Sequence, residues 1–133
     1  MDTGAADRLA VRERLDAYAD AVFRKDADDW GQCWAEDGVW DLGRGEVSGR
    51  ANIVKTWVSA MTMFEFVVFQ IHPGVITIEG DRARSRSYVL ETLFNADGAM
   101  RKQLGQYDDE LARDGATWRF ARRSYKVLKG MPS

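Results

Sequence analysis

The first part of the chain alternates apolar and polar residues with a helical period. Apolar side chains recur every three or four residues between positions 9 and 23, and charged side chains fill most of the remaining positions. The apolar positions are Leu9, Val11, Leu15, Tyr18, Ala19, Val22 and Phe23. This spacing predicts an amphipathic helix of about five turns whose apolar stripe faces a core.

The following segment breaks this helix and predicts two more. The acidic run 25–29 supplies N-cap carboxylates for a second helix that passes through Trp30, Cys33 and Trp34. Turn residues at 37–38 and 43–45 bracket a short strand over 39–42. Ser48 is the expected N-cap of a third helix, which carries an apolar stripe through residues 53–61.

From residue 75 onward the period changes to that of strands. Gly80-Asp81 separates strands over 75–79 and 83–94, and turns at 95–98 and 113–115 lead to strands near 101–111 and 117–128. Three helices followed by a meander of long strands predict one α+β domain over residues 1–133. Its helices should pack on one face of a curved, mainly antiparallel sheet.

Alternation along the strands assigns their inner face. Ile76 and Ile78 are apolar, and His72 shares their parity, so His72 should point inward unless Pro73-Gly74 forms a bulge. Glu91 falls on the inner face of the next strand, where a carboxylate would face the concave interior.

The last strand contains a conflict of parity. Trp118 and Phe120 would share one face, whereas Tyr125 would lie on the other. A bulge somewhere within 121–124 would reconcile them, which leaves open whether Arg122 or Arg123 faces inward.

Composition narrows the class of protein. The 133 residues are 45% hydrophobic, enough for a substantial core. The net charge of −2 gives no reason to expect nucleic acid or a membrane as partner. One cysteine, Cys33, and one histidine, His72, provide neither a disulfide nor a cysteine- or histidine-rich metal site. No signal peptide or apolar span is visible, so we expect a cytoplasmic protein. We also expect no metal and no cofactor.

His72 is the first candidate for catalysis. It lies between two apolar runs, and an imidazole that titrates near neutrality is suited to proton transfer. A buried, hydrogen-bonded structural histidine would give the same pattern.

Several segments resemble the nuclear-transport-factor-2-like superfamily, and within it the SnoaL-like group. They are residues 18–26, 34–40, 49–53, 79–83 and 107–120, in this order. The group includes scytalone dehydratase, hexachlorocyclohexane dehydrochlorinase and polyketide cyclases, and ketosteroid isomerase is a further relative. The resemblance implies a cone-shaped, cystatin-like fold, with a bent sheet around helices and one apolar pocket at the wide end.

The family's carboxylates are replaced in this chain. Dehydratase-like members pair an Asp at the end of the first helix with a His from the sheet. The resemblance places that His at His72, but the Asp position holds Phe23. In ketosteroid isomerase the tyrosine position corresponds to Tyr18 and the Asp position to Leu42. The dehydrochlorinase has a variable pocket residue at the position of Arg123.

We therefore expect a pocket for an apolar small molecule. The expected catalytic residues are His72, Tyr18 and Glu91. The expected substrate-binding residues are Phe23, Trp34, Trp40, Val89, Gln103, Tyr107 and Arg123. Three functions remain open: a lyase or isomerase with His72 as general base or acid, a catalytically silent binding protein, and an accessory subunit of the same fold.

The expected outer face of the sheet carries arginines together with Tyr88, Leu90 and Leu104. Apolar residues on a solvent-facing sheet predict a two-fold homodimer through this face.

Overall fold

The computed structural model describes residues 3–132. The first helix, α1 (Thr3–Arg24), carries most of the predicted stripe: Val11, Leu15, Tyr18 and Val22 are buried, whereas Leu9 and Phe23 at its ends are exposed. It stops at Lys25, which adopts a positive φ of 51°. Asp26 then caps α2 (Ala27–Gln32) by accepting a hydrogen bond of 3.0 Å from the Asp29 amide, as the acidic run predicted.

Several element boundaries differ from the prediction: the strand expected over 75–79 begins at Phe66, the strand expected over 39–42 begins at Trp34, and the short strand Glu46–Ser48 was not predicted. The second helix is shorter, because Trp34 already begins strand β1 (Trp34–Asp41). The third helix, α3 (Arg50–Met61), has Gly49 as its N-cap, not Ser48. Gly49 has a φ of 88°, a conformation that glycine adopts without strain, and no side chain caps this helix.

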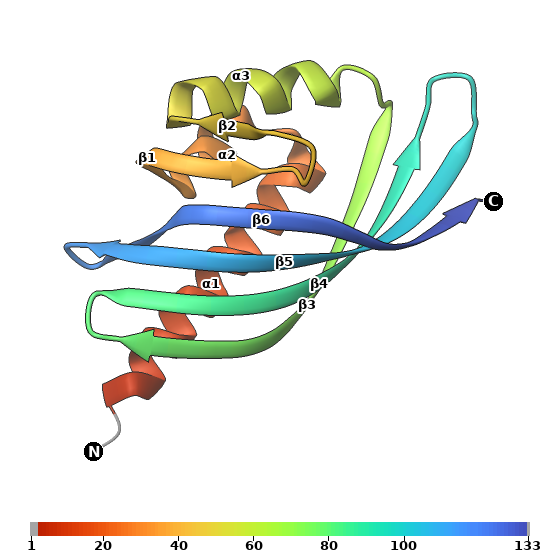
Figure 1. Ribbon diagram of the computed structural model, residues 1–133. Coiled ribbons are helices and arrows are strands. Elements are labelled where there is room, and N and C mark those ends of the chain that lie inside the picture. Colours follow the sequence, from red (N-terminus) through yellow and green to blue (C-terminus); the bar gives the residue numbers. More distant parts are fainter. Residues whose placement is uncertain (1–2, 133) are drawn as a thin grey trace.

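Six strands form one mixed sheet in the order β2-β1-β6-β5-β4-β3. They are β1, β2 (Glu46–Ser48), β3 (Phe66–Glu79), β4 (Arg82–Phe94), β5 (Met100–Asp114) and β6 (Thr117–Pro132). Among the described residues only the β1–β6 pairing is parallel, so the predicted α+β fold with a mainly antiparallel sheet is confirmed. In Figure 1 the long strands curve past α1, while α2 and α3 lie beside β1 and β2.

Register shifts along the strands set the faces of the sheet, and two of them matter for the site. Between β5 and β6 the register shifts at Glu110/Leu111, where Ala121 is the extra residue. The bulge expected within 121–124 is therefore present, and it turns Arg123 inward and Arg122 outward. A second shift on β3, between Pro73 and Ile76, changes the face of the residues before it.

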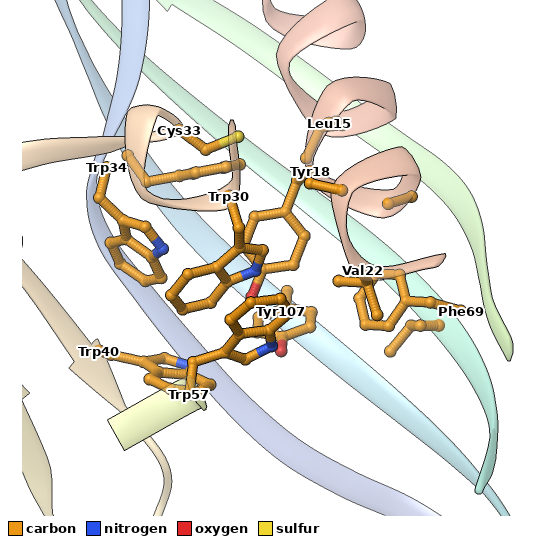
Figure 2. Packing of buried hydrophobic residues seen from close by; sticks show 14 of the residues in the cluster. Leu15, Tyr18, Val22, Trp30, Cys33, Trp34, Trp40, Trp57, Phe69 and Tyr107 are labelled. Atoms are coloured by element: carbon orange, nitrogen blue, oxygen red, sulfur yellow. The ribbon is translucent and has the colours of Figure 1, made fainter. Parts of the chain in front are cut away.

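Tryptophans dominate the core between α1, α2, α3 and the sheet. Trp30 stacks on Trp57 with 4.5 Å between ring centroids and 8° between planes. Trp34 and Trp40 lie 5.7 Å and 5.5 Å from Trp30. Figure 2 shows these rings crowded against Tyr18 and Tyr107. Buried aromatic pairs at such separations stabilise a core beyond the burial of their area.

A buried ion pair joins β5 to β6 beneath these rings. Arg123 donates from Nε to Asp109 Oδ1 at 2.7 Å and from Nη2 to Oδ2 at 3.2 Å, and both side chains are fully buried. Ser85 on β4 donates to the same carboxylate at 3.1 Å. The guanidinium carbon lies 3.8 Å from the Tyr107 ring centroid, 4.2 Å from Phe120 and 4.4 Å from Tyr18.

Removing one partner of this pair should destabilise the fold strongly. Arg123→Met leaves the Asp109 carboxylate buried and unpaired, so the free energy of unfolding should fall by about 3–5 kcal/mol in urea denaturation. The double variant Arg123→Met, Asp109→Leu should recover most of this loss, because no unpaired charge remains. Equal losses in the single and double variants would contradict this account.

Candidate functional site

An apolar pocket opens between α1, α3 and the inner face of the sheet. Its volume is about 380 Å³, near the lower end of the range for small-molecule sites. Its apolar wall includes Val22, Trp40, Trp57, Met61, Phe69 and Leu93. Its polar lining consists of Tyr18, Arg44, Glu91, Arg101, Gln103, Tyr107 and Tyr125.

Aromatic rings with polar tips form part of the wall. The Nε1 of Trp40 is buried and has no hydrogen-bond partner among residues 3–132. Burial raises the pKa of Tyr18 to about 12. Burial also raises the pKa of Tyr107 well above its ordinary value, and the neighbouring Tyr18 adds to the increase. Both hydroxyls stay protonated at neutral pH and can donate hydrogen bonds, as can the Trp40 N–H.

A polar cluster lies on adjacent strands at one side of the pocket. Tyr125 on β6 donates its hydroxyl to Glu91 Oε1 on β4 at 3.1 Å. Gln103 on β5 donates to the Tyr125 oxygen at 3.0 Å and approaches Glu91 Oε1 at 3.5 Å. We call Glu91, Gln103 and Tyr125 the carboxyl cluster.

Gly105 makes the carboxyl cluster possible. A Cβ atom built at this position would overlap the Tyr125 ring. Because glycine has no side chain, the ring crosses β5 on the inner face and its hydroxyl reaches Glu91 on the strand beyond. Gly105 therefore fixes the direction of Tyr125.

Burial raises the pKa of Glu91, because desolvation disfavours the carboxylate. Hydrogen bonds from Tyr125 and Gln103 and the positive charge of Arg101 act in the opposite direction and limit the increase. Burial and the neighbouring Glu91 likewise raise the pKa of Tyr125. A carboxyl whose pKa rises toward neutrality can both accept and return a proton.

The structure brings five of the predicted site residues to the pocket: Tyr18, Trp40, Glu91, Gln103 and Tyr107. Trp34, Val89 and Arg123 are buried in the surrounding core and do not line it. Their predicted inward orientation is correct, but other side chains lie between these three residues and the cavity.

His72 does not line the pocket, because the bulge at Pro73-Gly74, the stated exception to its inward orientation, is present. The bulge after Pro73 puts Val67, Phe69 and Ile71 on the inner face, so His72 faces outward opposite Tyr88 and is exposed. A Cβ on Gly74 would lie 2.8 Å from the Arg86 carbonyl oxygen, so this bulge needs glycine.

Phe23 was also expected to line the pocket, and it does not. Its side chain is 38% exposed and lies beside Phe66, with 6.4 Å between ring centroids. Tyr18 and Val22, one helical turn apart, face the cavity, and Phe23 is rotated away from them. The family's Asp–His pairing therefore has no counterpart at these two positions.

Tyr125 is the main residue that sequence reasoning missed. Once the bulge at Ala121 is known, Tyr125 shares the inner parity of Arg123. A lone glycine inside strand 101–111 was a further signal of a close approach at that position.

The opposite face of the sheet carries a groove of about 580 Å³, lined largely by charged residues. Several of these charges are held in ion pairs, as Arg86 is with Asp108 at 2.9 Å. Small-molecule sites are mostly apolar, which favours the inner pocket as the candidate site. Within residues 3–132, no helix has the length and apolarity to cross a membrane. No group of three or more His, Cys, Asp or Glu side chains in that range could hold a metal ion.

Comparison with known families agrees with the motifs found in the sequence. A family model described as a SnoaL-like domain matches residues 3–124. No curated protein matches the chain by sequence.

Solved structures extend this likeness to the fold. Three of them come from Novosphingobium aromaticivorans. One, named as a candidate aromatic ring hydroxylase, is 29% identical with a TM-score of 0.86, over 96% of this chain and 94% of that chain. A candidate scytalone dehydratase is 20% identical with a TM-score of 0.86, and the match covers 99% of this chain and 91% of that chain. An NTF2-like protein with a cystatin-like fold is 24% identical with a TM-score of 0.80, and the match covers 94% of this chain and 84% of that chain. The predicted cystatin-like fold is confirmed.

The hydrogen bond from Tyr125 should be measurable through the carboxyl that accepts it. Tyr125→Phe removes a donor that favours the charged form, so the pKa of Glu91 should rise further. Carbon-detected NMR titration of the glutamate side chains measures this shift. Tyr88→Phe, on the outer face, is the matched control and should leave the pKa unchanged. A lower pKa in Tyr125→Phe would contradict the assigned hydrogen bond.

Proposed function

Since this chain belongs to the SnoaL-like domain family, we propose that its pocket binds an apolar small molecule and transfers a proton on it, as a lyase or isomerase. In this proposal Glu91, and not His72, is the general base and acid. The observation that carries the proposal is a carboxyl at the wall of an apolar cavity, with a raised pKa and a tyrosine hydroxyl bonded to it.

The proposed chemistry begins with a ligand that carries a carbonyl group. The Glu91 carboxylate removes a proton from the adjacent carbon, and the electron pair of that C–H bond moves to the carbonyl oxygen to give an enolate. Where a C=C bond lies next to the deprotonated carbon, the protonated Glu91 returns the proton at the far end of the conjugated enolate. Where the next carbon carries a leaving group, that group departs with the electron pair of its bond as the carbonyl re-forms. General acid–base assistance of this kind accelerates reactions by about 100- to 10,000-fold.

The enolate oxygen needs donors, and the pocket wall offers them. Trp40 has an unpartnered buried N–H, and Tyr18 and Tyr107 stay protonated because burial raises their pKa. Donors fixed by the core stabilise developing charge without having to reorganise. Arg123 does not touch the pocket, and it supports Tyr18 and Tyr107 from below.

A catalytically silent binding protein is the second candidate. It is favoured by one observation: the positions of the family's Asp and His hold Phe23 and an outward-facing His72, neither of which lines the cavity.

Proton transfer can be tested without the natural substrate. 1-Tetralone, a bicyclic ketone, is the probe, and its exchange of α-hydrogen for deuterium in D₂O is followed by NMR. Trp40 and Trp57 report binding by fluorescence. Glu91→Gln should bind the probe with similar affinity and lose at least about 100-fold in exchange rate.

His72→Gln is the matched control and should retain both binding and exchange. Binding with no exchange in the wild type would support the silent binding protein. Loss of exchange in His72→Gln would contradict the assignment to Glu91.

We also propose that two copies associate through the outer face of the sheet. Tyr88, Leu90 and Leu104 are only partly buried there, and Leu90 lies directly opposite Leu104. The surrounding arginines would not repel a second copy, because Arg84 pairs with Glu79 at 2.7 Å and Arg86 with Asp108.

Light scattering coupled to size exclusion tests this association. The wild type should have the mass of a dimer, and Leu90→Glu should be monomeric, because a charge would be buried at the interface. Leu9→Glu is the control, since Leu9 is 58% exposed on α1, which packs on the other face of the sheet. A monomeric wild type at high micromolar concentration would contradict the proposal.

A further inference from the structure

Two arginines, Arg44 and Arg101, lie at the pocket. Both line the cavity and both are exposed. Within residues 3–132, neither guanidinium group forms a hydrogen bond or an ion pair with another side chain or with the backbone. Several other arginines are held by carboxylates: Arg24 contacts three of them, and Arg122 contacts Asp41 and Glu46.

Arg44 is presented by a fixed turn between β1 and β2. The turn is closed by hydrogen bonds from the Gly43 amide to Asp41 Oδ1 at 2.9 Å and from the Leu42 amide to the Gly45 carbonyl at 3.0 Å. Gly43 has a φ of 80°, and a Cβ on it would lie 3.3 Å from the carbonyl oxygen of Tyr125. The turn therefore lies against β6 at the strand position that carries the carboxyl cluster.

Arg101 approaches the same cluster from β5. Its positive charge lowers the pKa of both Glu91 and Tyr125, although it makes no ion pair with either. The arginine is thus near enough to act on Glu91 through space and remains available to another anion.

We propose that the pocket selects an amphipathic anion: an apolar body fills the cavity, and a carboxylate or phosphate group is held at the rim by Arg44 and Arg101. The inference rests on the proposed function, since it names the class of ligand for the same pocket. Guanidinium groups match the planar geometry of carboxylate and phosphate oxygens. The apolar wall of Trp40, Trp57, Met61 and Phe69 supplies the complementary surface.

Such a ligand would also change the carboxyl cluster. An anion paired with Arg101 cancels part of the positive field that lowers the pKa of Glu91. Glu91 would then hold a proton more firmly when the pocket is occupied than when it is empty. Occupancy by an anion is thereby linked to the protonation of the acid–base group.

The test compares probes that differ only in charge. 2-Naphthoate is the anion and 2-naphthamide is its neutral isostere; affinities are measured by tryptophan fluorescence and calorimetry at low salt. The wild type should bind the anion about tenfold more tightly. This preference should decrease as ionic strength rises, because the rim is exposed. 2-Naphthyl phosphate shows which anionic group the rim favours.

The double variant Arg44→Gln, Arg101→Gln should lose the preference for the anion and keep its affinity for the amide. Arg82→Gln, an exposed arginine that does not line this pocket, is the control and should behave as the wild type. NMR titration should show a higher Glu91 pKa with 2-naphthoate bound than with the amide.

Equal binding of the two probes by the wild type would overturn the inference, while the exchange of 1-tetralone hydrogens would still test the proposed function separately. A preference that survives in the double variant would also overturn it, since another cation would then be responsible. Failure of both probes to bind, together with failure of 1-tetralone, would overturn the proposed function as well.

Discussion

The Arg123–Asp109 ion pair is the interaction on which the arrangement of this protein depends. Two opposite charges are completely buried, joined by two hydrogen bonds and covered by three aromatic rings. A buried charge is tolerated only when its partner is well placed, so the pair restricts β5 and β6 to one register. Tyr18 and Tyr107, which rest on the guanidinium, are the same rings that line the pocket. The buried ion pair therefore helps to fix the position of the two tyrosine rings in the pocket wall.

The missing side chain of Gly105 determines the arrangement of the carboxyl cluster as much as the charged residues do. Without a side chain at Gly105, the Tyr125 ring can cross β5, and its hydroxyl then reaches a carboxyl two strands away. The raised pKa of Glu91 is a balance between burial and these donors. A small change of backbone or ring position would alter this balance, because desolvation and hydrogen bonding act in opposite directions on the same group.

The helices, the later strands and most of the sheet faces were predictable from the sequence, because the helical and strand periods are clear there, whereas β2 and the first half of β3 were missed. The inner face of β4 follows simple alternation from Ala83 to Leu93 and was correct, including Glu91. Alternation alone failed for His72, because the bulge that the sequence left open at Pro73-Gly74 is present and reverses the parity of the residues before it. The same effect was anticipated on β6, where the conflict between Phe120 and Tyr125 revealed the bulge. Asp109 shares the inner parity of Tyr107, but no local pattern shows that its charge would be matched by Arg123.

The bulge at Pro73 and Gly74 also affects how readily the edge of the sheet can pair with strands of other molecules. β3 is the last strand of the sheet, so its outer edge carries backbone groups that could pair with a strand from another molecule. Proline has no amide hydrogen to offer, and the shifted register interrupts the row of donors and acceptors halfway along the strand. At the other edge, β2 spans only Glu46–Ser48. Both ends of the sheet are therefore poor templates for further strands, and the same local distortion that directs the histidine away from the pocket helps to protect the protein from aggregation.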